Sequence, residues 1–135
     1  QEEDGMTLLE ILIVLVILGL IATLGALQLS TYLGRAKTDT ARLQIQELTT
    51  ALELYRIDAS RAPTTAEGLN ALLQKPEGAT NWRGPYVRKA QNLLDPWGRP
   101  FNYKSPGEHG EYDLMSLGAD NQPGGEGEAT DVKSW

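Results

Sequence analysis

The chain has 135 residues, a size that favours a single domain, and its formal net charge at pH 7 is −6. This acidic balance disfavours a nucleic-acid-binding protein, because such proteins present a basic face to the phosphates. The sequence contains no cysteine, which excludes disulfides and thiolate metal sites.

An apolar segment runs from Met6 to Leu29, and Glu10 is its only charged residue. A segment of this length suffices for a membrane-spanning helix, which needs roughly 20 residues. A secretory signal peptide would have a shorter apolar core preceded by basic residues, whereas the residues before this segment are acidic. The pattern therefore predicts a membrane-spanning helix, and a passive membrane anchor is the simplest interpretation of its composition.

Glu10 argues against a passive anchor. A carboxylate within the apolar span costs about 2.5–3.5 kcal/mol on insertion scales, and the segment offers no Lys or Arg to pair with it. An ionisable group in the membrane is a functional-site hypothesis by default. A free α-amino group on another copy of the chain is a possible cationic partner.

After Leu29 the sequence becomes amphipathic. Apolar residues recur at spacings of three and four, which places them on one helical face: Ala41, Ile45, Leu48, Leu52 and Tyr55. Because no proline occurs before Pro63, the simplest prediction is one helix from about Thr7 to Asp58. Three apolar residues off this face indicate that a second face is also covered: Leu43, Leu54 and Ile57. A coiled coil is the alternative for this half, but the heptad-like stretch is too short to favour it.

The residues that follow predict a small α+β unit. Thr64 and Glu67 have the spacing of a helix-capping box, and Asp95–Gly98 has the residues of a tight turn. Apolar residues alternate on either side of 106–110, which predicts two strands joined by a hairpin: Phe101, Tyr103, Tyr112 and Leu114. We expect an antiparallel sheet of about three strands, packed on the apolar face of the long helix.

Residues 117–131 combine four acids with four glycines. One interpretation is a solvated, disordered end. The other is a calcium loop, because calcium takes six to eight oxygen ligands from carboxylates and carbonyls, and glycines let the backbone wrap the ion. The spacing does not match an EF-hand, and composition alone leaves both interpretations open.

The entry to the apolar segment resembles the class III signal of type IV pilins and pseudopilins: Gly5-Met6-Thr7-Leu8-Leu9-Glu10. The resemblance implies that a prepilin peptidase cuts between Gly5 and Met6 and that Met6 becomes an N-methylated terminus. It also implies that Glu10 pairs with the terminal amine of a neighbouring subunit. The chain departs from the family in having Met6 where Phe is usual, acids where Lys or Arg is usual before Gly5, and no proline near Leu27.

Further segments resemble the major pseudopilin family of the type II secretion system: Tyr55–Asp58, Pro63–Thr65 with Glu67–Leu69, Asp95–Pro100 with Tyr103, Tyr112–Leu114, and Ser116–Asp120 with Gly124 and Gly125. The family fold is a long helix with a small sheet and a calcium-binding tail. The resemblance implies that the Ca²⁺ ligands include the carbonyls of Leu117, Gln122 and Gly125 and the side chain of Asp120. Many members have a further aspartate where this chain has Gly127, so the second carboxylate must come from Glu126, Glu128 or Asp131.

The expected organisation has four parts: a leader remnant (1–5), a transmembrane and filament-core helix (6–29), the amphipathic half of that helix (30–58), and a periplasmic α+β domain (59–135) with the calcium loop 117–131. The resemblance implies a non-enzymatic subunit that polymerises into the type II secretion pseudopilus and helps to export folded proteins across the outer membrane. Its implied partners are other copies of the chain, minor pseudopilins, the inner-membrane assembly platform and the prepilin peptidase.

Two other functions are less well supported. A type IV pilin for adhesion, motility or DNA uptake usually carries a C-terminal disulfide, and this chain has no cysteine. A membrane-anchored enzyme lacks a credible catalytic group, because His109 is the only histidine and lies in a Gly-rich loop, and Ser116 has no neighbouring base. We therefore expect a surface position for His109 and no enzymatic activity.

Overall fold

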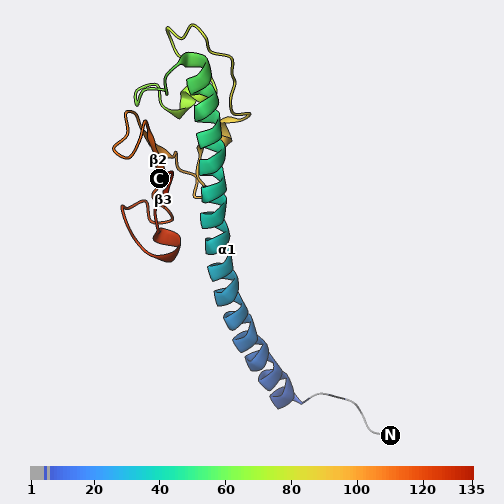
Figure 1. Ribbon diagram of the computed structural model, residues 1–135. Helices are drawn as coiled ribbons and strands as arrows, with labels where there is room; N and C mark the ends of the chain where they lie inside the picture. The colour runs from blue at the N-terminus through green and yellow to red at the C-terminus, as the bar shows by residue number, and fades with distance from the viewer. Residues whose placement is uncertain (1–4, 6) are drawn as a thin grey trace. The chain divides into compact units, whose positions relative to one another are not determined.

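The computed structural model describes Gly5 and residues 7–135 (Figure 1). Helix α1 (Leu8–Ala59) has 52 residues. Six short elements follow it: the 3-10 turns η1 (Leu69–Leu72), η2 (Ala90–Leu93) and η3 (Gly127–Ala129), and the strands β1 (Asn102–Lys104), β2 (Asp113–Ser116) and β3 (Val132–Lys133). The predicted α+β class is confirmed. The chain divides into two compact units, the first ending at Gly34 and the second running from Arg35 to Trp135.

The first unit contains the apolar part of α1. By length and composition alone, this helix is sufficient to cross a membrane. Its described side chains from Thr7 to Leu33 are all exposed, and most of them are apolar. The hydroxyls of Thr23 and Thr31 donate to the carbonyls of Gly19 and Leu27, so these polar groups are satisfied within the helix, as a hydrocarbon environment requires.

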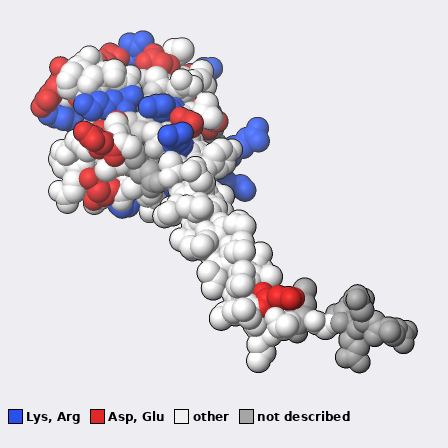
Figure 2. All heavy atoms as spheres, turned by 90° about the horizontal axis from the view of Figure 1, so that it is seen from below, with Lys and Arg blue, Asp and Glu red and all other residues white. Residues whose placement is uncertain are grey.

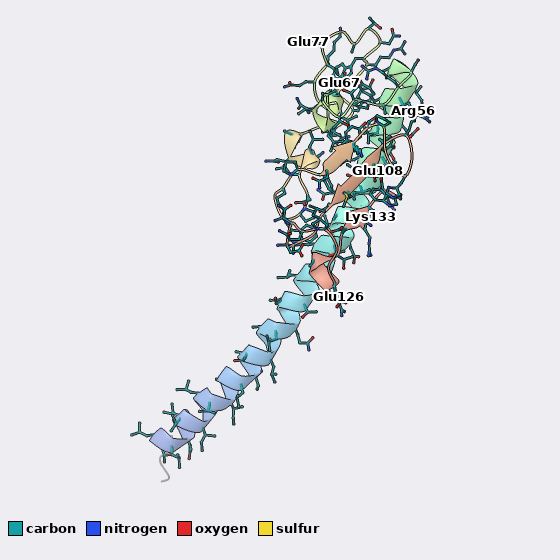
Figure 3. The ribbon with its side chains drawn as sticks, turned by 90° about the vertical axis from the view of Figure 1, so that its left-hand side faces the viewer. Arg56, Glu67, Glu77, Glu108, Glu126 and Lys133 are labelled. Atoms are coloured by element: carbon teal, nitrogen blue, oxygen red, sulfur yellow. The ribbon has the colours of Figure 1, made fainter. Side chains whose placement is uncertain are left out.

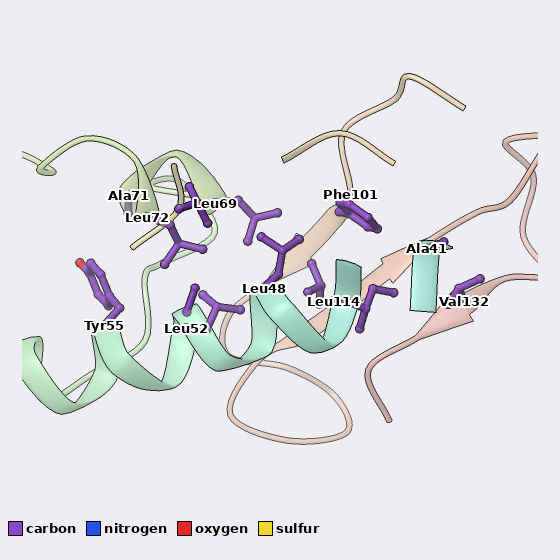
Figure 4. Packing of buried hydrophobic residues seen from close by; sticks show 13 residues of the cluster. Ala41, Leu48, Leu52, Tyr55, Leu69, Ala71, Leu72, Phe101, Leu114 and Val132 are labelled. Atoms are coloured by element: carbon purple, nitrogen blue, oxygen red, sulfur yellow. The ribbon is translucent and has the colours of Figure 1, made fainter. Parts of the chain in front are cut away.

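In the second unit, α1 supplies one side of the hydrophobic core (Figure 4). The predicted apolar face is confirmed, because all five of its residues are buried: Ala41, Ile45, Leu48, Leu52 and Tyr55. The other side of the core comes from Leu72 of η1, Leu114 of β2 and Val132 of β3, together with Phe101. The spacing of three and four along α1 thus provides a continuous apolar surface on which the short elements pack.

The three strands form an antiparallel sheet in the order β1-β2-β3. Tyr103 of β1 is paired with Leu114, and Ser116 of β2 is paired with Val132. The hairpin between β1 and β2 is confirmed. Leu114 is fully buried in the central strand, so its side chain lies where the sheet meets the core. The third strand comes from the last residues of the chain, which follow the loop 117–131.

Two features differ from the sequence-based expectations. The Thr64–Glu67 capping box forms, but only one 3-10 turn follows it, because Gly68 adopts a left-handed φ of 64° that an α-helix does not permit. The second apolar face of α1 is not covered by the described residues: Leu43, Leu54 and Ile57 are 61%, 50% and 73% exposed.

Candidate functional site

The start of α1 is capped by Thr7. The backbone N–H of Glu10 donates to Thr7 Oγ1 at 3.2 Å, and the N–H of Ile11 donates to the Thr7 carbonyl at 3.2 Å. Glu10 itself is exposed, and no Lys or Arg occurs before Arg35. Figure 2 shows the charged side chains gathered on the second unit, whereas the described helix of the first unit is nearly free of them. The Glu10 carboxylate therefore has no cationic partner in its own unit, among the residues that the structure describes.

The predicted processing site is only partly described. Gly5 is exposed, and Met6 lies outside the described residues. Cleavage between these two residues and methylation of Met6 stay predictions.

Residues 117–131 connect β2 with β3 and wrap through a series of left-handed backbone positions. Asn121 has a φ of 54°, and four glycines also have positive φ values: Gly118, Gly124, Gly125 and Gly127. A residue with a Cβ rarely adopts this conformation, which explains the glycine content of the loop. Gly125 is also tightly packed, because a Cβ there would lie 2.5 Å from the Ala129 carbonyl oxygen.

Two of the predicted carboxylates lie in this loop with one oxygen bound to backbone. Asp120 Oδ1 accepts from the N–H of Gln122 at 3.0 Å, and Asp131 Oδ2 accepts from the N–H of Gly124 at 2.9 Å. Asp131 Oδ1 is buried and has no hydrogen-bond partner among the described residues. Burying a carboxylate oxygen without a partner is unfavourable, and calcium is a partner for such an oxygen. This one oxygen of the loop therefore fits a calcium ligand.

The predicted ligand set would be dominated by the carbonyls of Leu117, Gln122 and Gly125. The described residues contain no cluster of three or more His, Asp or Glu side chains suited to a metal, so a site in the loop depends on these carbonyls. Among the other acids of the loop, Glu126 is exposed. The structure places residues 117–131 in one loop, as the sequence predicted, but the ion itself stays a prediction.

The start of the loop is held by the turn at Asp95, which is buried. Its Oδ1 accepts from the backbone N–H groups of Trp97 (3.1 Å) and Arg99 (2.9 Å), and its Oδ2 accepts from the Ser116 hydroxyl at 2.8 Å. The Arg99 guanidinium donates to the carbonyl of Gly118. The sequence predicted the turn but not these contacts. Ser116 and Gly118 are distant from the turn in the sequence, and only the tertiary fold brings them next to Asp95 and Arg99.

Comparison with known proteins decides the family. A family described as "Type II secretion system (T2SS), protein G" matches residues 28–135. The chain belongs to the type II secretion system protein G family. Proteins named type II secretion system core protein G are 39% identical in Pseudomonas aeruginosa and 40% identical in Vibrio cholerae. These alignments cover 100% of this chain and 96% and 93% of the two relatives, respectively.

A solved structure shows the same fold. It is the crystal structure of the major pseudopilin from the type 2 secretion system of enterohaemorrhagic Escherichia coli, with a TM-score of 0.62 and 33% identity. The match covers 74% of this chain and 87% of that chain. The resemblance deduced from the sequence motifs is confirmed.

The remaining candidate residues of this protein G family member have structural contacts. His109 is 46% exposed, its Nδ1 lies 3.2 Å from Asp113 Oδ2, and its ring stacks on Trp135 at 4.2 Å between centroids. Burial alone would raise the pKa of Asp113, but the N–H groups of Glu108 and His109 and the His109 ring hold it below its ordinary value. Ser116 is buried and donates to Asp95. The histidine thus contacts β2 and the last residue of the chain, and the serine contacts the turn at Asp95.

Proposed function

We propose that this protein is a major pseudopilin, a structural subunit that polymerises into the type II secretion pseudopilus and helps to export folded proteins. The observation that carries the proposal is the apolar half of α1, whose described side chains are all exposed, in a chain of the protein G family. Such a surface is unfavourable in water. Lipid covers it before assembly, and the helices of other copies cover it in the filament.

Glu10 gives assembly its specificity. In the membrane its carboxylate is costly to bury without a partner. Cleavage after Gly5 creates a terminal ammonium group on each subunit, so a neighbouring copy supplies the cation that the apolar segment lacks. Pairing of the two charges in a low-dielectric filament core is stronger than in water, and it sets the register between adjacent helices.

The same assignment implies a location and partners. The apolar half of α1 resides in the inner membrane, and the second unit lies in the periplasm. Other copies of the chain are the main partner, and minor pseudopilins, the assembly platform and the prepilin peptidase are the others. The protein acts as a filament subunit and not as an enzyme, which accords with the structural contacts of His109 and Ser116.

Calcium is the cofactor in this proposal. The Asp120 side chain and the carbonyls of Leu117, Gln122 and Gly125 would hold it, with a second carboxylate from Glu126, Glu128 or Asp131. The ion would act as a cross-link within a domain that has no disulfide. The support is the buried, unpartnered oxygen of Asp131 and the tight glycine backbone of the loop.

Assembly of a Glu10→Gln variant tests the function. Expressed with a complete secretion system, this variant is expected to insert in the membrane but to yield few or no sheared filaments, because the neutral amide cannot form an ion pair with an ammonium group. Glu77→Gln is the control, since Glu77 is exposed and pairs with no described residue. Normal filaments from Glu10→Gln would refute the pairing. The intact mass of the membrane-extracted protein shows independently whether the chain begins at a methylated Met6.

A further inference from the structure

We propose that Arg35 and Lys37 bind the phosphate groups of acidic phospholipids at the periplasmic surface of the inner membrane, before the subunit enters the filament. This inference rests on the proposed function, which places the apolar half of α1 in that membrane. It assigns a lipid-binding surface to the first residues of the second unit, which directly follow the apolar half of the same helix.

The length of the apolar half indicates where the membrane surface meets α1. From Leu8 to Leu33 the helix has roughly 26 residues, which corresponds to about 39 Å at 1.5 Å per residue. The hydrocarbon core of a bilayer is about 30 Å thick, and the headgroup layers bring the total to about 40–45 Å. A helix of this length fills the core and ends within the headgroup layer. The residues that directly follow Leu33 therefore lie at the level of the lipid phosphates.

An aromatic residue supports the same position of the membrane surface. Tyr32 is 70% exposed and lies near the end of the apolar half. Tyrosine is enriched at membrane–water interfaces, because its ring is apolar and its hydroxyl is polar. Figure 3 shows the side chains of the apolar half projecting from the helix on all sides, as contact with lipid requires.

Arg35 and Lys37 are the first two cations of the chain, and both are exposed. Neither side chain has a hydrogen-bond or ion-pair partner among the described residues, because Asp39, the next acid in the sequence, is bound to Arg42 at 3.3 Å. A guanidinium group binds phosphate through two parallel hydrogen bonds, and an ammonium group binds it as a point charge. Lipid phosphate thus supplies the anion that both cations lack.

Helix geometry directs the two side chains towards the membrane. Side chains on an α-helix tilt towards its N-terminus, and the N-terminal half of α1 is the apolar one. Arg35 and Lys37 are two positions apart, so they lie about 200° apart around the helix axis. They therefore contact different lipid molecules, and their contributions to binding are independent.

The test uses the full chain in detergent micelles that contain equal amounts of phosphatidylglycerol and phosphatidylcholine. Native mass spectrometry measures how much of each lipid the monomer binds. The wild type is expected to prefer phosphatidylglycerol. Arg35→Gln and Lys37→Gln should each lower this preference about fivefold, and the double variant should lower it by the product of the two effects.

Two control variants separate lipid binding from net charge and from folding. Arg88→Gln combined with Lys89→Gln removes two exposed cations further along the second unit, and it should leave the lipid preference unchanged. Arg35→Lys combined with Lys37→Arg keeps both charges at the same level of the helix, and it should also retain the preference. All variants should melt at the temperature of the wild type, because the exchanged side chains are exposed.

The outcomes are distinct. An unchanged lipid preference in the double variant of Arg35 and Lys37 would overturn the proposal, as would an equal loss in the Arg88 and Lys89 control or a loss in the charge-preserving variant. If the double variant keeps its lipid preference but forms no sheared filaments, the two cations pair with acidic groups of another copy, and the lipid assignment is wrong. Flotation of the wild type with phosphatidylcholine vesicles tests membrane insertion separately. If the protein does not float with the vesicles, the proposed membrane location fails and this inference fails with it.

Discussion

Replacing Glu67 with glutamine tests the contacts that this residue makes with Arg61 and Thr64, just before η1. Glu67 Oε1 accepts from the Thr64 N–H at 3.0 Å, and the Glu67 N–H donates to Thr64 Oγ1 at 3.1 Å. Arg61 adds two bonds, of 2.6 Å and 3.1 Å, to the two carboxylate oxygens. Glutamine keeps the size and one acceptor oxygen of the side chain but removes the charge. The substitution therefore isolates the ion pair from the capping geometry.

The magnitude follows from the pKa of Glu67. The hydrogen bonds from the Arg61 side chain are the main cause that lowers this pKa. Burial opposes the shift, the contacts with Thr64 add to it, and the pKa falls from 4.5 to about 2. Because each pKa unit corresponds to about 1.36 kcal/mol, the upper limit is about 3.4 kcal/mol. The Arg61 side chain is 48% exposed, so solvent screening reduces the value. We expect Glu67→Gln to lower the free energy of unfolding by about 1–2 kcal/mol at pH 7.

The sign of the pH dependence is fixed by the direction of the shift. Since the folded pKa lies below the unfolded value, the stabilisation is fully present above about pH 4.5 and is lost as the pH falls towards 2. As the pH falls towards 2, Glu67 becomes protonated and resembles glutamine. The difference in the free energy of unfolding between the wild type and the variant should therefore vanish.

Thermal melts of the full chain in detergent, followed by circular dichroism at pH 7, 4 and 2.5, measure this difference. A loss of 1 kcal/mol corresponds to roughly 4–8 °C for a domain of this size. Glu77→Gln is the matched control, because it removes an exposed carboxylate that pairs with no described residue, and it should stay within about 0.5 kcal/mol of the wild type. A difference for Glu67→Gln that is absent at pH 7, or that persists unchanged at pH 2.5, would refute the reasoning.

Three further predictions concern the core and the loop. Leu52→Ala should destabilise the second unit by about 2–5 kcal/mol in denaturant titrations, because Leu52 is fully buried; Leu43→Ala, at an exposed site, should have little effect. Gly125→Ala should lower both the melting temperature and the calcium affinity more than Gly127→Ala, because only the first Cβ meets a neighbouring carbonyl, at 2.5 Å. Calcium at 100 times its Kd should stabilise the wild type by about 2.7 kcal/mol, and a melting temperature that EDTA leaves unchanged would contradict calcium binding.

The sequence by itself determined the elements that depend on local spacing. The apolar residues of α1 repeat every three or four positions, and this period needs no distant contact to be recognised. The buried face from Ala41 to Tyr55 was therefore predictable. The same holds for the capping box of Thr64 and Glu67 and for the β1–β2 hairpin, whose signals lie within a few residues of each other.

Only the tertiary structure decided which distant groups meet. The sequence showed that Asp95 begins a turn, but not that its second oxygen binds the hydroxyl of Ser116. It showed several acids between 117 and 131, but not that Asp131 is the one with a buried, unpartnered oxygen. Such contacts depend on how the loop folds back between β2 and β3, and local spacing carries no information about that path. The pairing of side chains far apart in the chain is fixed by packing against α1 and by the sheet register.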